Sequence, residues 1–148
     1  MKFSDKADFS RFGKSFQESL CQLVLQDRPF ADQIFEVLDY NFFELKYLQA
    51  FVQKIFSYRE RYGIHPSSKV MVTILRSDIE NESEAVQKQL RDYFARIYQQ
   101  EIQDSEYIKD TALEFCKKQK LKEAMMKSVK LLNNSSFDEI STVINDAL

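Results

Sequence analysis

The residues best suited to catalysis or metal binding are few and scattered. Histidine occurs once, at His65, in a short loop just before Pro66. A zinc site takes three or four histidine, cysteine or carboxylate ligands, and a histidine that activates a nucleophile needs that nucleophile within hydrogen-bond reach. No cysteine or second histidine lies near His65 in the sequence. We therefore interpret His65 as an ordinary loop residue and predict no metal site around it.

The carboxylates also give no sign of an active site. Glu80, Glu82 and Glu84 alternate with residues typical of a solvated loop and a helix cap. No carboxylate pair stands in apolar surroundings, as a general acid and base would. The chain has only two glycines, Gly13 and Gly63, whereas a phosphate-binding loop needs glycines in a cluster. We therefore predict that the chain is not an enzyme by itself and holds no cofactor.

Two segments carry the basic residues that nucleic acids attract. In residues 91–98, arginines alternate with aromatic side chains, as on surfaces that stack single-stranded bases. However, Leu90, Phe94 and Ile97 share one helical face, so we expect Phe94 in the core. The second segment is rich in lysines that fall on all sides of a helix, which favours a solvated surface over weak phosphate attraction. The alternative of weak nucleic-acid contact rests on Lys117, Lys118, Lys120 and Lys122.

The apolar residues near the C-terminal end form the most informative cluster. Met125, Met126, Leu131 and Leu132 cover too wide an arc of a helix for one neighbouring helix to bury. Methionine suits a surface that repacks against a partner, and leftover apolar surface on a helical hairpin favours subunit contact. Packing within the hairpin is the alternative. We predict self-association through the apolar residues Met125, Met126, Val129, Leu132, Phe137, Ile140 and Ile144.

Helical periodicity runs through the elements that must position these residues. Two glycines and two prolines in 148 residues are too few for the frequent turns of an all-β fold. The segment 70–75 is rich in β-branched residues, but a strand without a partner would leave its backbone unpaired, so we predict a helix there. Capping boxes are predicted at residues 81–84 and 136–139. Apolar spacing predicts helices over residues 14–28, 29–38, 45–62, 70–75, 86–97, 105–132 and 137–147.

These elements divide the chain into three parts. Residues 1–13 are polar and predict a flexible arm, residues 14–104 a compact head of short helices, and residues 105–148 a helical hairpin. Head and hairpin form one domain of an all-α fold, because a chain of this length buries one core. Cys21 and Cys116 lie far apart in apolar helical patterns, so we predict buried free thiols rather than a disulfide.

Composition also indicates where the protein works. The net charge of −2 and the pI near 5.5 create no general attraction for nucleic acid or anionic lipid. The first residues lack the apolar stretch of a secretory signal, and no apolar run approaches the roughly 18 residues that a membrane span requires. We therefore expect a cytoplasmic protein with no membrane partner.

Several stretches of the chain are similar to those of one family. Residues 15–27 are similar to an opening helix, and Phe42-Phe43 and residues 62–66 flank the third helix as an aromatic residue and a glycine-containing loop. Residues 106–124, with residues 137–140 beyond them, are similar to a helical hairpin. On these residues the chain resembles the N-terminal domain of replicative DNA helicases of the DnaB type, particularly those encoded by phages. The resemblance covers nearly all of the chain.

The resemblance implies a specific function. Such domains are all-helical, pair through their hairpins and assemble as a trimer of dimers into the collar of a hexameric ring. There they regulate the helicase and dock primase or a helicase loader, and the ATPase domain follows a linker. We therefore expect a non-catalytic assembly and regulatory domain that contacts DNA only indirectly, in a bacterial or phage-infected cell. The alternative is a stand-alone single-stranded nucleic-acid-binding protein or a loader-like helical adaptor.

Overall fold

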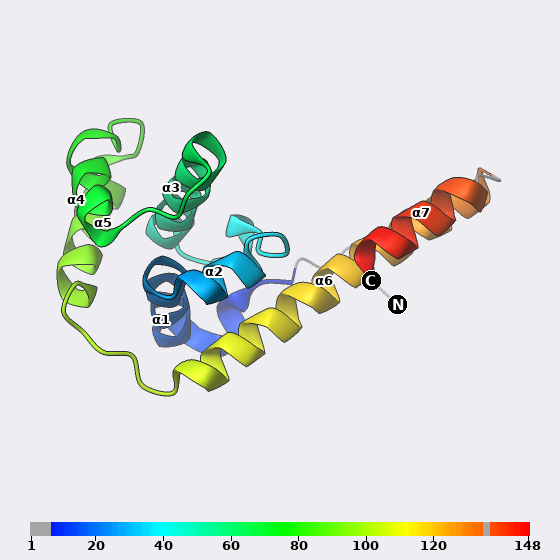
Figure 1. Ribbon diagram of the computed structural model, residues 1–148, viewed down its shortest axis with the longest axis horizontal. Helices are drawn as coiled ribbons and strands as arrows, with labels where there is room; N and C mark the ends of the chain where they lie inside the picture. The colour runs from blue at the N-terminus through cyan, green and yellow to red at the C-terminus, as the bar shows by residue number, and fades with distance from the viewer. Residues whose placement is uncertain (1–6, 135–136) are drawn as a thin grey trace.

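The computed structural model describes residues 7–134 and 137–148, and within these ranges the chain forms helices and loops without a strand (Figure 1). The prediction of an all-α fold is therefore confirmed. The elements, in chain order, are the short 3-10 helix η1 (Phe9–Phe12), α1 (Gly13–Gln26), α2 (Arg28–Ile34), the 3-10 helix η2 (Tyr40–Phe42), α3 (Lys46–Tyr62), α4 (Ser68–Ser77), α5 (Glu84–Ile97), α6 (Ser105–Asn133) and α7 (Phe137–Ala147).

Helix boundaries in the head follow local chemistry. The Asp27 carboxylate accepts a hydrogen bond from the backbone N–H of Phe30 at 3.1 Å and so caps α2. Pro29 lies in the first turn of α2, where its missing N–H leaves no bond unmade. α3 ends at Gly63, whose φ of 70° is left-handed and suits glycine. These turns allow α2 and α3 to pack on α1.

The segment 70–75 lies in α4, as the sequence predicted. The Ser67 hydroxyl accepts a hydrogen bond from the Val70 N–H at 3.1 Å and caps the first turn. Met71 and Leu75, which lie one turn apart, are both buried in the core. A helix pairs the backbone of this segment internally, whereas a strand would find no partner strand in the described part of the chain.

The N-terminal segment requires a correction to the sequence analysis. The first six residues of the predicted flexible arm 1–13 lie outside the described residues, but Phe9–Phe12 form η1. Phe9 is fully buried, and its ring centroid lies 5.0 Å from that of Phe43 and 4.9 Å from that of Phe115. Aromatic packing therefore holds residues 9–12 against the head, although the polar residues around them predicted a flexible arm.

The start of α5 also differs from the prediction. Asn81 is not the N-cap, because the Ser83 hydroxyl takes that place and accepts a hydrogen bond from the Val86 N–H at 3.2 Å. Glu84 is then the first residue of the helix, too early for the third helical position that a capping box requires. The second predicted box begins at Ser136, which lies outside the described residues.

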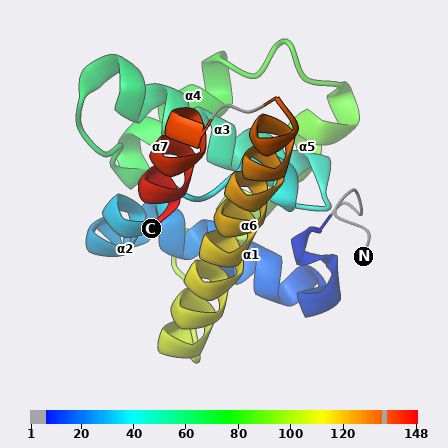
Figure 2. The ribbon, with the colours of Figure 1, turned by 90° about the vertical axis from the view of Figure 1, so that its right-hand side faces the viewer.

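α6 joins the head to the rest of the chain. Its first half packs on α1 and α2, and its second half extends away from the head with α7 folded back along it (Figure 1, Figure 2). The Lys109 ammonium group anchors the first half, because it lies 3.0 Å from the Asp27 carboxylate at the junction of α1 and α2. The molecule thus carries α4 and α5 at one end and the hairpin of α6 and α7 at the other (Figure 1).

Two further predictions concern the state of the cysteines and the presence of a membrane-spanning helix. Cys21 and Cys116 are buried free thiols, as predicted. Burial raises the pKa of both, that of Cys116 to about 12, so the reactive thiolate is suppressed. No helix within residues 7–134 and 137–148 is both long and apolar enough to cross a membrane.

Candidate interaction surface on the hairpin

The hairpin has an inner seam where its two helices meet. The small side chain of Ala124 is buried on α6, and the half-buried Ser128 one turn later donates a hydrogen bond to the Ala124 carbonyl at 2.8 Å. On α7, Ile140, Val143 and Ala147 recur at helical spacing and are half-buried. The seam therefore occupies one side of each helix and leaves the other sides to solvent.

Away from the seam, the hairpin exposes large apolar side chains. Five of them are between 37% and 57% exposed. Those on α6 recur mainly at three- and four-residue steps, which aligns them along the helix. We name this set the hairpin apolar surface; it consists of Met125, Met126, Val129, Leu132 and Ile144.

Five of the seven residues predicted for self-association are thus exposed. Ile140 instead contributes to the inner seam, and the side chain of Phe137 lies outside the described residues. Leu121, which the sequence analysis did not select, is also exposed and extends the apolar stripe by one turn before Met125. The signal that could have found Leu121 is its four-residue spacing from Met125.

The two helices of the hairpin carry opposite charges. Residues 117–133 of α6 contain six lysines and one glutamate, whereas residues 137–148 contain three carboxylates and no basic residue. Within the described residues, no ion pair joins a lysine of α6 to an acidic residue of α7. Lys118 pairs with Glu114 on its own helix at 2.9 Å. The hairpin therefore presents a basic helix beside an acidic one.

The lysines considered for nucleic-acid contact do not form one strip. Each residue turns an α-helix by about 100°. Lys117 and Lys120, three residues apart, therefore lie on one side of α6, and Lys118 and Lys122, four residues apart, lie on another. Lys120 is also half-buried. A phosphate backbone running along one side of α6 would meet two of these lysines.

In the basic and aromatic segment 91–98, two of the three aromatic side chains belong to the core. Tyr93 is fully buried, and its hydroxyl donates a hydrogen bond to the backbone carbonyl of Glu18. Phe94 is buried, as predicted. Arg96 lies 2.6 Å from the Glu18 carboxylate. Burial would raise the pKa of Glu18, but hydrogen bonds from Arg96 and a tyrosine hydroxyl outweigh it and lower that pKa. Tyr93 and Phe94 are therefore unavailable as stacking platforms, whereas Tyr98 is 47% exposed.

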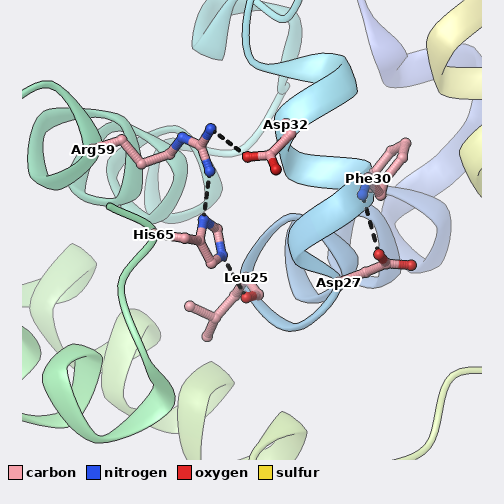
Figure 3. Close-up of polar contacts among 6 residues, drawn as sticks. All are labelled: Leu25, Asp27, Phe30, Asp32, Arg59 and His65. Atoms are coloured by element: carbon pink, nitrogen blue, oxygen red, sulfur yellow. Dashed lines mark hydrogen bonds and ion pairs between the residues drawn. The ribbon is translucent and has the colours of Figure 1, made fainter. Parts of the chain in front are cut away.

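His65 lies in a polar cluster that joins separate elements of the head (Figure 3). Its Nδ1 atom accepts a hydrogen bond from the Arg59 guanidinium at 2.9 Å, and its Nε2 atom donates to the Leu25 carbonyl at 2.7 Å. A guanidinium only donates, so the imidazole is neutral and carries its proton on Nε2. Arg59 also lies 2.7 Å from the Asp32 carboxylate. The cluster therefore ties the end of α1 and the middle of α2 to the end of α3.

The surroundings of His65 favour its neutral form. Burial lowers its pKa, and the positive charge of Arg59 acts in the same direction, while the hydrogen bond to Leu25 and the charge of Asp32 oppose them. The described residues contain no group of three histidine, cysteine or acidic side chains that could hold a metal ion. This cluster was not predicted, because no spacing in the sequence relates residues 25, 32, 59 and 65.

No family model, no curated protein and no solved structure matches this chain.

Proposed function

We propose that this chain is a non-catalytic assembly domain that associates with itself through the hairpin apolar surface, as the N-terminal domain of a DnaB-type replicative helicase does. The observation that carries the proposal is the set of half-exposed apolar side chains on a two-helix projection, away from the core of the head. The sequence resemblance to that helicase domain supports the same assignment. A regulatory role and docking of primase or a loader are what the resemblance implies, and the cytoplasmic location that we expect from the sequence is compatible with them.

The charges of the hairpin support a second copy of the chain as the occupant. A two-fold interface must be complementary to itself, because the same surface is used by both partners. The basic outer part of α6 and the acidic α7 meet this condition, since the α6 of one copy can lie beside the α7 of the other. The lysines of each α6 then face the carboxylates of the partner's α7 on both sides of the two-fold axis, and this pairing fixes the orientation of one hairpin relative to the other.

The amount of apolar surface indicates how strong this association is. Burying one large apolar side chain completely stabilises a complex by about 1.5–3 kcal/mol, and half-exposed side chains contribute about half of that. The ten such side chains of two hairpins then contribute about 10 kcal/mol, against an association cost of about 4–15 kcal/mol. At the lowest association cost the net gain is about 6 kcal/mol, so we expect a weak dimer with a dissociation constant of roughly tens of micromolar, reinforced by further contacts in a larger ring.

The proposal is tested by sedimentation equilibrium of the purified chain from low to high micromolar concentration. Val129→Asp should shift the dimer to a monomer without loss of helicity in circular dichroism. The matched control is Ile64→Asp, because Ile64 is as exposed as Val129, 57% in each case, but lies on the head. The control should leave the dimer intact. A wild-type chain that stays monomeric at high micromolar concentration, or a dimer that survives Val129→Asp, contradicts the proposed interface.

A nucleic-acid-binding function makes a different prediction for the same protein. Binding through the lysines of α6 would weaken steeply with salt, because each phosphate contact releases counterions. We expect no binding of a fluorescent single-stranded oligonucleotide at low salt, since Lys117, Lys118, Lys120 and Lys122 point to different sides of the helix. Salt-dependent binding that Lys117→Glu weakens would favour that function over assembly.

A further inference from the structure

A small groove lies between α4 and α5, at the end of the molecule opposite the hairpin (Figure 1). Its volume is about 220 Å³. Leu75 and Phe94 are almost fully buried and form the apolar floor together with the half-buried Val72. Ala95 is exposed at the edge, and its small side chain leaves the groove open. A space of this size is smaller than a typical cofactor pocket and suits one or two side chains.

Two arginines border this apolar floor. Arg76 of α4 and Arg91 of α5 are exposed, and neither has an ion pair within the described residues. The nearby Asp78 at the end of α4 lies 3.6 Å from Lys54 instead. Helical spacing places Lys69 on the Arg76 side of α4 and Lys88 on the Arg91 side of α5. The groove therefore has an apolar floor bordered by two arginines without an ion pair in the described part of the chain, although Glu84 lies two turns before Arg91 on the same side of α5.

This combination selects the chemistry of a ligand. Each arginine can bind a carboxylate through two parallel hydrogen bonds, and the floor accepts an apolar side chain that excludes water. A single-stranded nucleic acid would need an exposed aromatic face for stacking inside the groove. Phe94, the aromatic residue of the lining, is only 8% exposed, and the exposed Tyr98 packs against Phe94 outside the lining. Both ligands would satisfy the arginines, but the burial of Phe94 favours a protein segment over a nucleic acid.

We propose that the groove between α4 and α5 binds a partner protein through a short acidic segment that inserts a large apolar side chain between Arg76 and Arg91. The groove and the hairpin lie at opposite ends of the molecule, so a partner can occupy the groove while the hairpins are paired (Figure 1). The proposal goes beyond self-association and does not depend on it, because no residue is shared between the two surfaces.

The test measures the binding of three fluorescent peptides to the full chain by anisotropy. The first has a central Phe-Leu pair flanked by aspartate and glutamate, the second replaces this pair by alanines, and the third replaces the acidic residues by lysine and arginine. The first peptide should bind at micromolar concentration, and the other two at least about tenfold more weakly. A fluorescent oligothymidylate is the nucleic-acid probe and should bind no better than the third peptide.

Two variants assign the binding to the groove. The double change Arg76→Glu and Arg91→Glu should weaken the first peptide at least about tenfold, and Ala95→Trp should do the same by filling the groove. The matched control, Lys127→Glu with Lys130→Glu, makes the same charge change on exposed residues of the hairpin and should leave binding unchanged. Circular dichroism establishes that each variant is folded.

Two outcomes overturn the proposal. One is the absence of any preference for the first peptide, or a preference that both groove variants retain. The other is binding of the oligothymidylate that the arginine double variant abolishes, which would assign the groove to nucleic acid. A monomeric chain that still binds the first peptide leaves this proposal standing and contradicts only the self-association of the hairpin.

Discussion

Lowering the pH from about 7.5 to about 5.5 is expected to weaken the fold through one side chain, His65, because histidine is the residue that ordinarily titrates in this interval. The chain contains a single histidine. Its pKa in the folded protein is lowered, chiefly by burial. The unfolded chain, with an ordinary histidine pKa of about 6.5, therefore binds a proton more readily than the folded chain. The free energy of unfolding is constant above about pH 6.5 and falls as the pH decreases toward the folded pKa.

The size of the effect follows from the contacts of the imidazole. Protonation places an N–H on Nδ1, against the Arg59 guanidinium, so the 2.9 Å hydrogen bond between them is lost. A hydrogen bond of this kind contributes about 1 kcal/mol, which corresponds to a decrease of about 2–4 °C in the melting temperature of a chain of this length. Asp32 favours the charged imidazole and Arg28 opposes it, so the two partly cancel.

The assay is urea unfolding followed by circular dichroism across this pH interval. His65→Gln should unfold at lower urea concentration at neutral pH, because the Leu25 carbonyl and Arg59 lose their partner, and should remove the pH dependence. Glu18, Asp27 and Asp32 do not interfere, since their pKa values are lowered and they titrate at more acidic pH. A flat profile for the wild-type chain, or a slope that persists in His65→Gln, refutes the assignment of His65 as a neutral structural link.

Three further results are expected. Phe9→Ala should lower the free energy of unfolding by about 3–5 kcal/mol in urea titrations, because it removes a fully buried ring. A loss below about 1 kcal/mol would contradict the packing of this segment on the head. Asp27→Ala removes both the cap of α2 and the contact with Lys109, and should lower the free energy of unfolding by about 1–2 kcal/mol; Asp27→Asn, which can still cap, should melt at a higher temperature than Asp27→Ala. Cys21 and Cys116 should react with iodoacetamide in urea but resist it in the native protein, as followed by mass spectrometry, because both thiols are buried with raised pKa values; rapid native labelling would contradict that burial.

Local sequence was sufficient to predict most helices and the residues at which several of them end. Gly63 predicted the end of α3, because a left-handed residue ends a helix at low cost only if it is glycine. The segment 70–75 was predicted as helix because a strand would lack a partner, although its β-branched residues suggested otherwise. The prediction was wrong where two neighbouring residues had equal chemistry: both Asn81 and Ser83 can cap a helix, and the chain path selects Ser83.

The hairpin was predicted correctly only in part. The arc covered by Met125, Met126, Leu131 and Leu132 predicted an exposed apolar surface from periodicity alone; Met125, Met126 and Leu132 are exposed, and Leu131 is half-buried. The same periodicity could not place Ile140, because a residue on the apolar side of α7 can lie in the seam or at its edge. Only the packing angle of the two helices separates these positions.

The amino-acid sequence by itself therefore determined the all-α class, the helices and the apolar stripe of the hairpin, since these depend on side chains within a few turns of one another. The tertiary structure alone decided the burial of Phe9, the link from His65 to Leu25 and Arg59, and the groove between Arg76 and Arg91. Each of these brings together residues from separate elements. Their proximity results from packing of the whole core, in which many weak contacts between distant segments act together.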